Sequence, residues 1–130
     1  KVASGGELSR FLLALKVVLA DKGSVPVLIF DEIDTGVGGA VADAIGKRLA
    51  RLAQSVQVLT VTHAPQVAAR AQIHLLIEKQ AIEEGAFMRT HVRPLDTGMR
   101  GEEVARMLAG ATITEEARAA AQRLMREVGV

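Results

Sequence analysis

The segment VLIFDE, residues 27–32, joins an apolar run to two carboxylates. Four consecutive apolar residues are typical of a strand covered on both faces, as strands of parallel sheets are. A second such run, VQVLTVT, occupies residues 56–62, and residues 40–53 between them have the apolar spacing of a helix. Strand, helix and strand in this order predict a right-handed βαβ unit whose parallel strands end at one edge. The helix is expected to bury Val41, Ile45, Leu49 and Leu52.

Polar side chains follow both predicted strands. Asp31 and Glu32 end the first strand, and His63 follows the second. Ligands of open α/β folds bind at this edge, where Asp31 could hold Mg²⁺ through its water shell and Glu32 could orient or deprotonate an attacking water. His63 could face the same pocket, since paired strands lie about 4.8 Å apart. Two structural alternatives stay open: the carboxylates could cap the following turn, and His63 could cap a helix that Pro65 begins.

The stretch Ser4-Gly5-Gly6-Glu7 precedes a predicted helix over residues 8–20. Its serine and glutamate have the spacing of a capping box. The glycine amides and the serine hydroxyl at a helix N-terminus would also form an anion site that favours phosphate. The stretch alone leaves both interpretations open. The helix is apolar on nearly every face and is expected to pack on several sides.

The rest of the chain predicts one further short helix, a hairpin and two C-terminal helices. Their expected positions are 65–70 for the short helix, 73–79 and 86–95 for the strands, 102–108 for the third helix, and a last helix that runs to Val128 after a capping box of Thr112 and Glu115. His74 and His91 fall in the hairpin strands without neighbouring ligands, which favours packing over metal binding.

The last helix has a basic and an apolar side. The basic residues are read as a solvated face, with DNA contact the less favoured alternative, and they are Arg118, Arg123 and Arg126. The residues expected to pack in the core are Ala117, Ala121, Leu124 and Val128.

Composition limits the classes of protein that fit. The chain is 49% hydrophobic and 24% charged, an ordinary globular balance. It has no cysteine, which excludes disulfides and thiolate metal sites and fits a reducing, cytoplasmic compartment. A net charge of +1 and 2% aromatic residues give no signature of a nucleic-acid surface. No apolar run approaches the roughly 20 residues of a membrane-spanning helix, so no membrane partner is expected.

Four stretches together carry a family resemblance. They are ASGGELSR at 3–10, FDEIDTGVGG at 30–39, VTHAPQVAA at 61–69 and EEVARMLAG at 102–110. This combination resembles the C-terminal head segment of the RecN family, bacterial double-strand-break repair ATPases related to SMC proteins. Within the wider ATP-binding-cassette superfamily, SGGELSR looks like the signature motif, VLIFDE like the Walker B strand, and His63 like the switch histidine.

The resemblance implies an α/β fold, with residues 1–130 forming the C-terminal half of an ABC/SMC-type P-loop ATPase head in which helices flank parallel strands. In this family two heads sandwich two ATP molecules, and the signature of one head contacts the γ-phosphate held by the other. The implied site residues are Ser4, Gly5, Gly6 and Glu7 for ATP binding, Asp31 for Mg²⁺, Glu32 as the catalytic carboxylate for water attack, and His63 as the group that senses the γ-phosphate.

Two positions depart from the family pattern. The signature begins with Ala3 where many relatives have Leu, and the D-loop position six residues after Glu32 is Gly38, where the superfamily usually has Asp. Asp34 resembles the SMC pattern, but the D-loop role is not moved onto it. The loop over 35–39 offers flexible backbone and amides instead.

The sequence contains no P-loop of the G-x-x-x-x-G-K-[ST] type. The chain, which starts without Met, is therefore interpreted as the tail of a longer protein whose other half supplies the P-loop and connects through a coiled coil. The isolated segment is expected to be inactive. The implied partners are this missing half, a second head in a homodimer, and DNA through the full-length protein, at the nucleoid of the bacterial cytoplasm.

Parts of the sequence also fit two other functions. A DEAD-type helicase-like motor is suggested by the letters DEID at 31–34, but the signature serine and glycines and the position of His63 argue against it. A non-hydrolytic dimerisation or scaffold module would keep the fold without turnover, and the intact Glu32 and His63 argue against that alternative.

Overall fold

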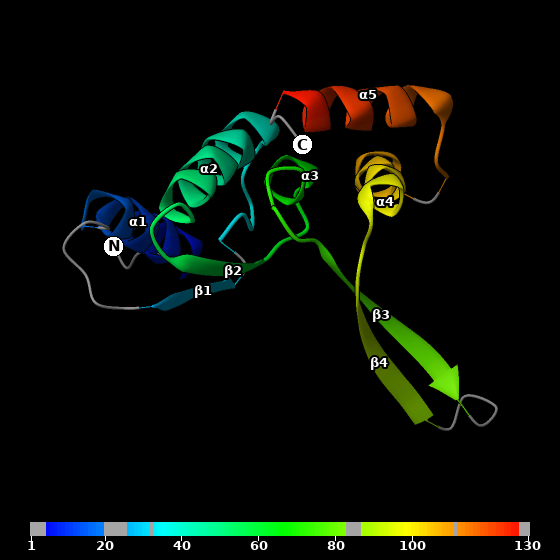
Figure 1. Cartoon of the computed structure of the whole chain (residues 1–130), viewed down its shortest axis with the longest axis horizontal. Helices are drawn as coiled ribbons and strands as arrows, with labels where there is room; N and C mark the ends of the chain where they lie inside the picture. The colour runs from blue at the N-terminus through cyan, green and yellow to red at the C-terminus, as the bar shows by residue number, and fades with distance from the viewer. Residues whose placement is uncertain (1–4, 20–25, 32, 83–86, 111, 128–130) are drawn as a thin grey trace.

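The computed structural model describes residues 5–19, 26–31, 33–82, 87–110 and 112–127. Its elements, drawn in Figure 1, are α1 (Gly5–Leu19), β1 (Val27–Asp31), α2 (Gly39–Leu52), β2 (Gln57–Val61), α3 (Pro65–Ala68), β3 (Leu75–Ile82), β4 (Phe87–Pro94), α4 (Thr97–Ala109) and α5 (Glu115–Arg126). None of these helices is both long and apolar enough to cross a membrane.

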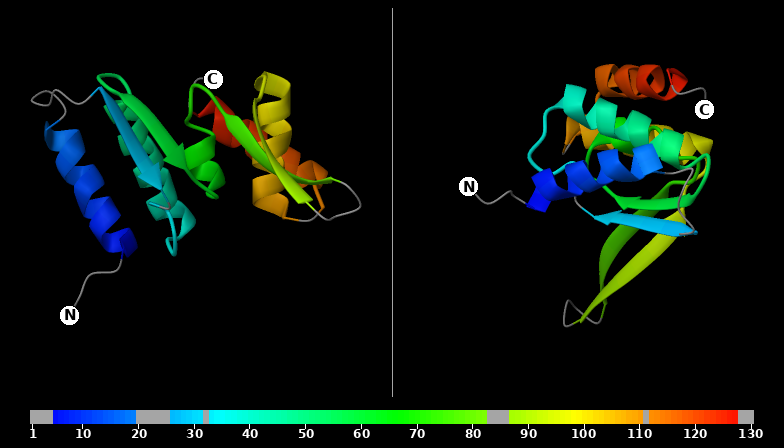
Figure 2. Two further views of the ribbon diagram at one scale, coloured as in Figure 1. Left: turned by 90° about the horizontal axis from the view of Figure 1, so that it is seen from below. Right: turned by 90° about the vertical axis from the view of Figure 1, so that its left-hand side faces the viewer.

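The predicted βαβ unit is confirmed. β1 and β2 pair in parallel, with a register that runs from Val27 opposite Gln57 to Asp31 opposite Val61, and α2 connects them. Figure 2 shows α1 and α2 side by side on one face of this pair. Both strands therefore end at the same edge.

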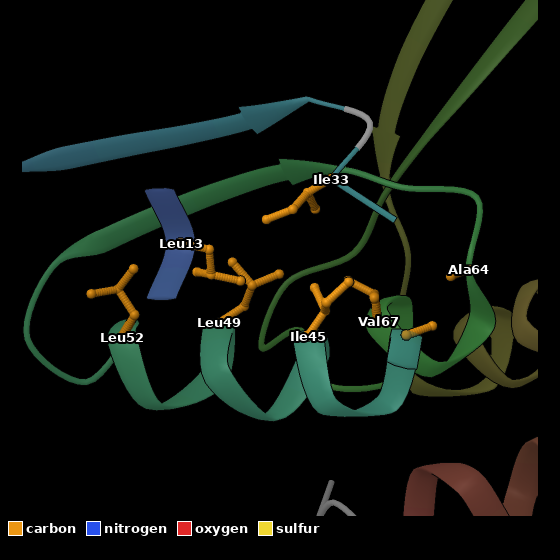
Figure 3. Packing of buried hydrophobic residues seen from close by; sticks show 8 residues of the cluster. Leu13, Ile33, Ile45, Leu49, Leu52, Ala64 and Val67 are labelled. Carbon is orange, nitrogen blue, oxygen red and sulfur yellow. The ribbon is translucent and has the colours of Figure 1, made fainter. Parts of the chain in front are cut away.

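The core of this unit lies between α1, α2 and the strands. Figure 3 shows Leu13 of α1 beside the side chains of α2. Ile33 lies on the strand side of these side chains, and Val67 lies next to Ile45. The buried residues of this cluster are Leu13, Ile33, Ala42, Ile45, Leu49, Leu52, Ala64 and Val67. The burial expected for three of the four helix residues is thus confirmed, but Val41 is exposed, because it lies at the margin of the buried stripe.

The expectation that both sheet faces are covered is wrong for the described part of the chain. Leu28 and Phe30 pack against the core, whereas Ile29, on the opposite face, is 71% exposed. The first helix also packs on only one side: Leu13 is 1% exposed, but Phe11 is 65% exposed. An apolar run indicates that a surface is buried against another segment, but it does not identify that segment.

The second half carries a hairpin and a helix pair. β3 and β4 form the predicted hairpin. They are antiparallel, with Leu75 opposite Pro94 and Ile82 opposite Phe87, and the hairpin projects away from the helices (Figure 1). The expected turn at 83–85 lies outside the described residues.

A second cluster joins α4 and α5, and its buried members are Ala69, Val104, Ala105, Ala121 and Met125. Ala117 and Leu124 pack at its margin, and Val128 lies outside the described residues.

Both C-terminal helices begin elsewhere than predicted. α4 starts at Thr97, before the predicted residue 102, because the Asp96 side chain accepts a hydrogen bond of 2.8 Å from the Met99 amide and caps the helix. α5 is capped by Thr114, which accepts from the Ala117 amide, and the predicted cap at Thr112 is wrong. Both caps are local hydrogen bonds that satisfy otherwise unpaired helix amides.

Candidate functional site

The predicted site residues fall at two places in the fold. Asp31 is the last residue of β1, and His63 follows the end of β2, so both lie at the C-terminal edge of the parallel pair. Gly5 and Gly6 are the first two residues of α1, and Glu7 lies in its first turn. Ser4 and Glu32 are outside the described residues.

The carboxylate that the structure brings beside His63 is that of Asp34, a residue to which the sequence analysis gave no role. Its Oδ2 accepts hydrogen bonds from the Thr62 hydroxyl at 2.5 Å and from the Ala64 amide at 3.0 Å. The Thr62 hydroxyl also accepts from the Ala64 amide at 3.0 Å. These bonds tie the loop after β1 to the loop after β2 across the edge of the sheet.

His63 lies over this buried carboxylate. Its Nδ1 is 3.8 Å from the Asp34 Oδ2, and the imidazole is 71% exposed while the Asp34 side chain is fully buried. The distance exceeds that of a hydrogen bond, about 2.7–3.2 Å, so the relation is electrostatic in this conformation. The edge thus presents an exposed imidazole above a buried carboxylate.

A tight turn carries Asp34 away from the strand. The Val37 amide donates to the Asp34 carbonyl at 3.3 Å, and Gly36 has a φ of 72°. A positive φ at the third position is what a type II turn requires, and glycine adopts it without steric cost. The turn lets the chain pass from the sheet edge into α2, which begins after Gly38.

The helix that follows His63 is fixed on two sides. Pro65 is the first residue of α3, as predicted, and its missing N–H costs nothing there. Arg70 donates to Asp43 of α2 at 2.7 Å, and Lys47 lies 2.8 Å from the same carboxylate. Hydrogen bonds from Lys47 and Arg70 hold the pKa of the Asp43 carboxyl below its ordinary value. The bond from Arg70 connects the segment after α3 to α2, whereas the Lys47 pair lies within α2.

Arg100 of α4 supports α3 from the other side. Its Nη2 donates to the carbonyl oxygen of Ala71 at 2.6 Å, and lies 3.5 Å from that of Ala69. Burial lowers the pKa of Arg100. Burial also lowers the pKa of His74, and the charge of Arg100 lowers it further. His74 is thus a half-buried packing residue, while His91 is exposed on β4.

No cluster of three or more metal-ligating side chains occurs among the residues that the structure describes. A depression of about 320 Å³ between α4 and α5 contains none of the predicted site residues, and its lining includes Gly98, Gly101, Arg118 and Met125. Arg118, expected to be solvated, pairs there with Glu102 and Glu115. Among the predicted site residues that the structure describes, Asp31 and His63 lie at the sheet edge, and Gly5, Gly6 and Glu7 lie at the start of α1.

Sequence reasoning missed Asp34, Thr62 and Arg100. The first two have a usable signal, since Asp34 lies three residues after Asp31 and Thr62 directly precedes His63, so parallel strands bring them to one edge. Arg100 has no such signal, because its partners are backbone carbonyls of a distant turn.

The fold has a solved counterpart. A structure from work on ATP-driven dimerization and DNA-stimulated activation of SMC ATPases superposes with a TM-score of 0.61 at 17% sequence identity, over 85% of this chain and 65% of that one. The parallel strands and their flanking helices thus share the α/β fold of that structure. This is the fold class to which the chain belongs.

Sequence relatives narrow the class. The chain is 51% identical to the DNA repair protein RecN of Rickettsia felis over 125 residues, 96% of this chain and 22% of that protein. It is 53% identical to RecN of Streptomyces coelicolor over 125 residues, and 47% identical to RecN of Xylella fastidiosa over 128 residues, with 96% and 98% of this chain and 22% and 23% of those proteins covered. No protein-family model matches. The chain belongs to the RecN family, and it spans about a fifth of the length of these curated relatives.

Proposed function

We propose that this chain is the C-terminal lobe of an ATPase head that, in the full-length protein, pairs with a second head on ATP binding and hydrolyses ATP to drive repair of DNA double-strand breaks. The observation that carries the proposal is the sheet edge at which Asp31 and His63 follow neighbouring parallel strands. That arrangement suits phosphoryl transfer, which needs charge and positioning rather than a protein nucleophile.

Each residue at the edge has a role that its chemistry permits. Asp31 is exposed at the end of β1, and an oxygen ligand there suits Mg²⁺, which takes few protein ligands and keeps several waters. Bound Mg²⁺ would neutralise charge on the phosphates. Glu32, the next residue, would orient and deprotonate the attacking water, and His63 would contact the γ-phosphate from the neighbouring strand.

The start of α1 would act on the ATP of the opposite head. Gly5 and Gly6 begin a helix of 15 residues, and the first amides of a helix lack partners within it. Those amides and the helix dipole favour an anion such as a phosphate. Ser4 would add a hydroxyl, and Glu7 lies in the same first turn. The signature stretch would thus serve as a phosphate cradle in trans.

The P-loop half of the same protein is the first partner of this lobe. The exposed Ile29 on the open face of the sheet and the exposed Phe11 on α1 support this, because apolar surface of this kind calls for cover. The chain alone, which has no P-loop, would not turn over ATP. DNA and the second head would be engaged through the full-length protein.

ATP turnover per head, measured against concentration in the full-length protein, tests the proposal. Ser4→Arg should lower turnover on the order of 10²-fold while ATP binding survives, because an added cation and a lost hydroxyl disturb a phosphate site. Gln54→Arg adds the same charge in the exposed turn after α2 and should leave turnover unchanged. Normal turnover by Ser4→Arg would reduce the stretch to a helix cap and refute the composite site.

A Glu32→Gln variant separates a working ATPase from a non-hydrolytic scaffold. In an ATPase the variant should accumulate ATP-bound dimers, visible by size-exclusion chromatography with ATP. A scaffold that never hydrolyses ATP would elute identically with and without the substitution.

A further inference from the structure

We propose that Asp34 is a positioning residue for His63: its buried carboxylate clamps the loop after β2 and faces the Nδ1 edge of the imidazole, which leaves Nε2 for a ligand at the sheet edge. The catalytic consequence rests on the proposed function, because the ligand there would be the γ-phosphate of ATP. The geometric part stands on contacts within this chain.

The clamp holds His63 from both sides. One oxygen, Asp34 Oδ2, accepts from the hydroxyl of the preceding residue, Thr62, and from the amide of the following residue, Ala64. Asp34 is only 1% exposed, so water does not compete for these bonds. His63 is therefore the middle residue of a segment that is fixed at both ends, while its own side chain is exposed.

The same carboxylate determines which nitrogen of the imidazole carries the proton. Nδ1 of His63 is 3.8 Å from Asp34 Oδ2, and the ring is exposed to solvent. A carboxylate opposite one ring nitrogen favours the proton on that nitrogen. Nδ1 then carries the proton and Nε2 faces outward. A ring that gains a second proton on Nε2 can donate to an anionic oxygen while Asp34 holds the other edge.

The clamp also connects two functional loops. Asp34 is anchored by its fully buried neighbour Ile33 and opens the turn that leads through Gly36 to α2. The turn and the His63 loop therefore share one carboxylate. A displacement of the loop over residues 35–39, where the family resemblance places the D-loop, would move the oxygen that orients His63.

Asp34→Asn distinguishes orientation of His63 from simple loop capping. The amide oxygen of asparagine can still accept from Thr62 and Ala64, so the loop is retained, but the negative charge is lost and the NH₂ group favours an unprotonated Nδ1. In serine proteases the equivalent Asp→Asn change keeps the geometry and produces the wrong histidine tautomer. Thr62→Val is the matched control, because it removes one clamp bond and keeps the carboxylate.

The first measurement is the tautomer of His63, read from ¹⁵N NMR of the 130-residue chain in dilute solution, at a pH where the ring is neutral. We expect the proton on Nδ1 in wild type and Thr62→Val, and on Nε2 in Asp34→Asn. An unchanged tautomer in a folded Asp34→Asn would overturn the proposal. If that variant does not fold, the wild-type spectrum decides: Nδ1–H supports the proposal and Nε2–H overturns it.

The second measurement is ATP turnover by the full-length protein. Asp34→Asn should lower kcat on the order of tenfold with KM nearly unchanged, as loss of residues that orient a functional side chain commonly does, and Thr62→Val should have a smaller effect. The two proposals fail separately. If Ser4→Arg turns over ATP normally, the composite site fails, yet the tautomer result still reports whether Asp34 orients His63.

Discussion

Arg70, in the turn that follows α3, donates a hydrogen bond of 2.7 Å to Asp43 of α2. The bond connects the segment after α3, which follows the His63 loop, to α2, which follows the Asp34 loop. The two loops of the candidate site are therefore linked through this one hydrogen bond, which we call the α2–α3 joint. The stability of this joint sets how well the site is preorganised.

Asp43 makes the joint dependent on pH. Its folded-state pKa is depressed below its ordinary value of 3.8, first by Lys47 and then by Arg70. The stabilisation is therefore fully present above about pH 4 and is lost as pH falls through the lower, folded-state pKa. Asp43→Asn should cost about 1 kcal/mol at pH 7 and progressively less toward pH 3, measured by urea denaturation. A cost that stays constant with pH would exclude an ionic contribution.

Gly46 permits the close approach of α3 to α2. A Cβ there would lie 2.8 Å from Cδ of Arg70 and 3.0 Å from the carbonyl oxygen of Gln66. We expect Gly46→Ala to destabilise the chain by about 1–2 kcal/mol in thermal unfolding, since overpacking exceeds the gain in helix propensity. In the matched control Gly101→Ala, the new Cβ has no neighbour within 4 Å, and stability should rise by up to about 1 kcal/mol. Equal effects at both positions would refute the steric account.

The cap of α4 should have a measurable free energy. Asp96→Ala removes the acceptor of the Met99 amide and should lower the free energy of unfolding by about 1 kcal/mol. Asp96→Asn keeps an acceptor oxygen and should restore most of it. Comparable losses in both variants would mean that charge, rather than the hydrogen bond, stabilises the start of α4.

Arg100 should be the costliest arginine to replace. Arg100→Met keeps much of the volume but leaves the Ala71 carbonyl without its donor in a half-buried position, for an expected loss of about 1–3 kcal/mol. Arg123→Met on the exposed face of α5 should change stability by less than about 0.5 kcal/mol. Chemical denaturation of both variants compares them, and a neutral Arg100→Met would show that the turn finds other partners.

Local sequence patterns predict the helices and strands better than they predict the contacts between them. Continuous apolar runs and a helical stripe are enough to predict β1, α2 and β2, because their signals lie within short windows. The start of α4 was placed too late, since Gly98 and Gly101 lower helix propensity and hide the effect of the Asp96 cap.

In the candidate site, too, the positions of residues along the strands are predictable from the sequence, whereas contacts between distant residues are not. That Asp31 and His63 share an edge followed from parallel pairing alone. The burial of Asp34 could not be read in the same way, because its main partner, Thr62, is 28 residues away and a carboxylate in a loop is normally exposed. The sequence likewise indicated apolar strand faces without indicating that one of them would remain open.

The two-stranded β1–β2 sheet has a consequence for handling the isolated chain. Within the described residues each strand pairs with one neighbour, so each has an edge whose backbone groups are available to another strand. Unprotected edges beside exposed apolar side chains template the addition of further strands, including strands from other copies. A longer polypeptide could extend the sheet at these edges. In a concentrated solution of this segment alone, we expect the same edges to promote intermolecular β-aggregation.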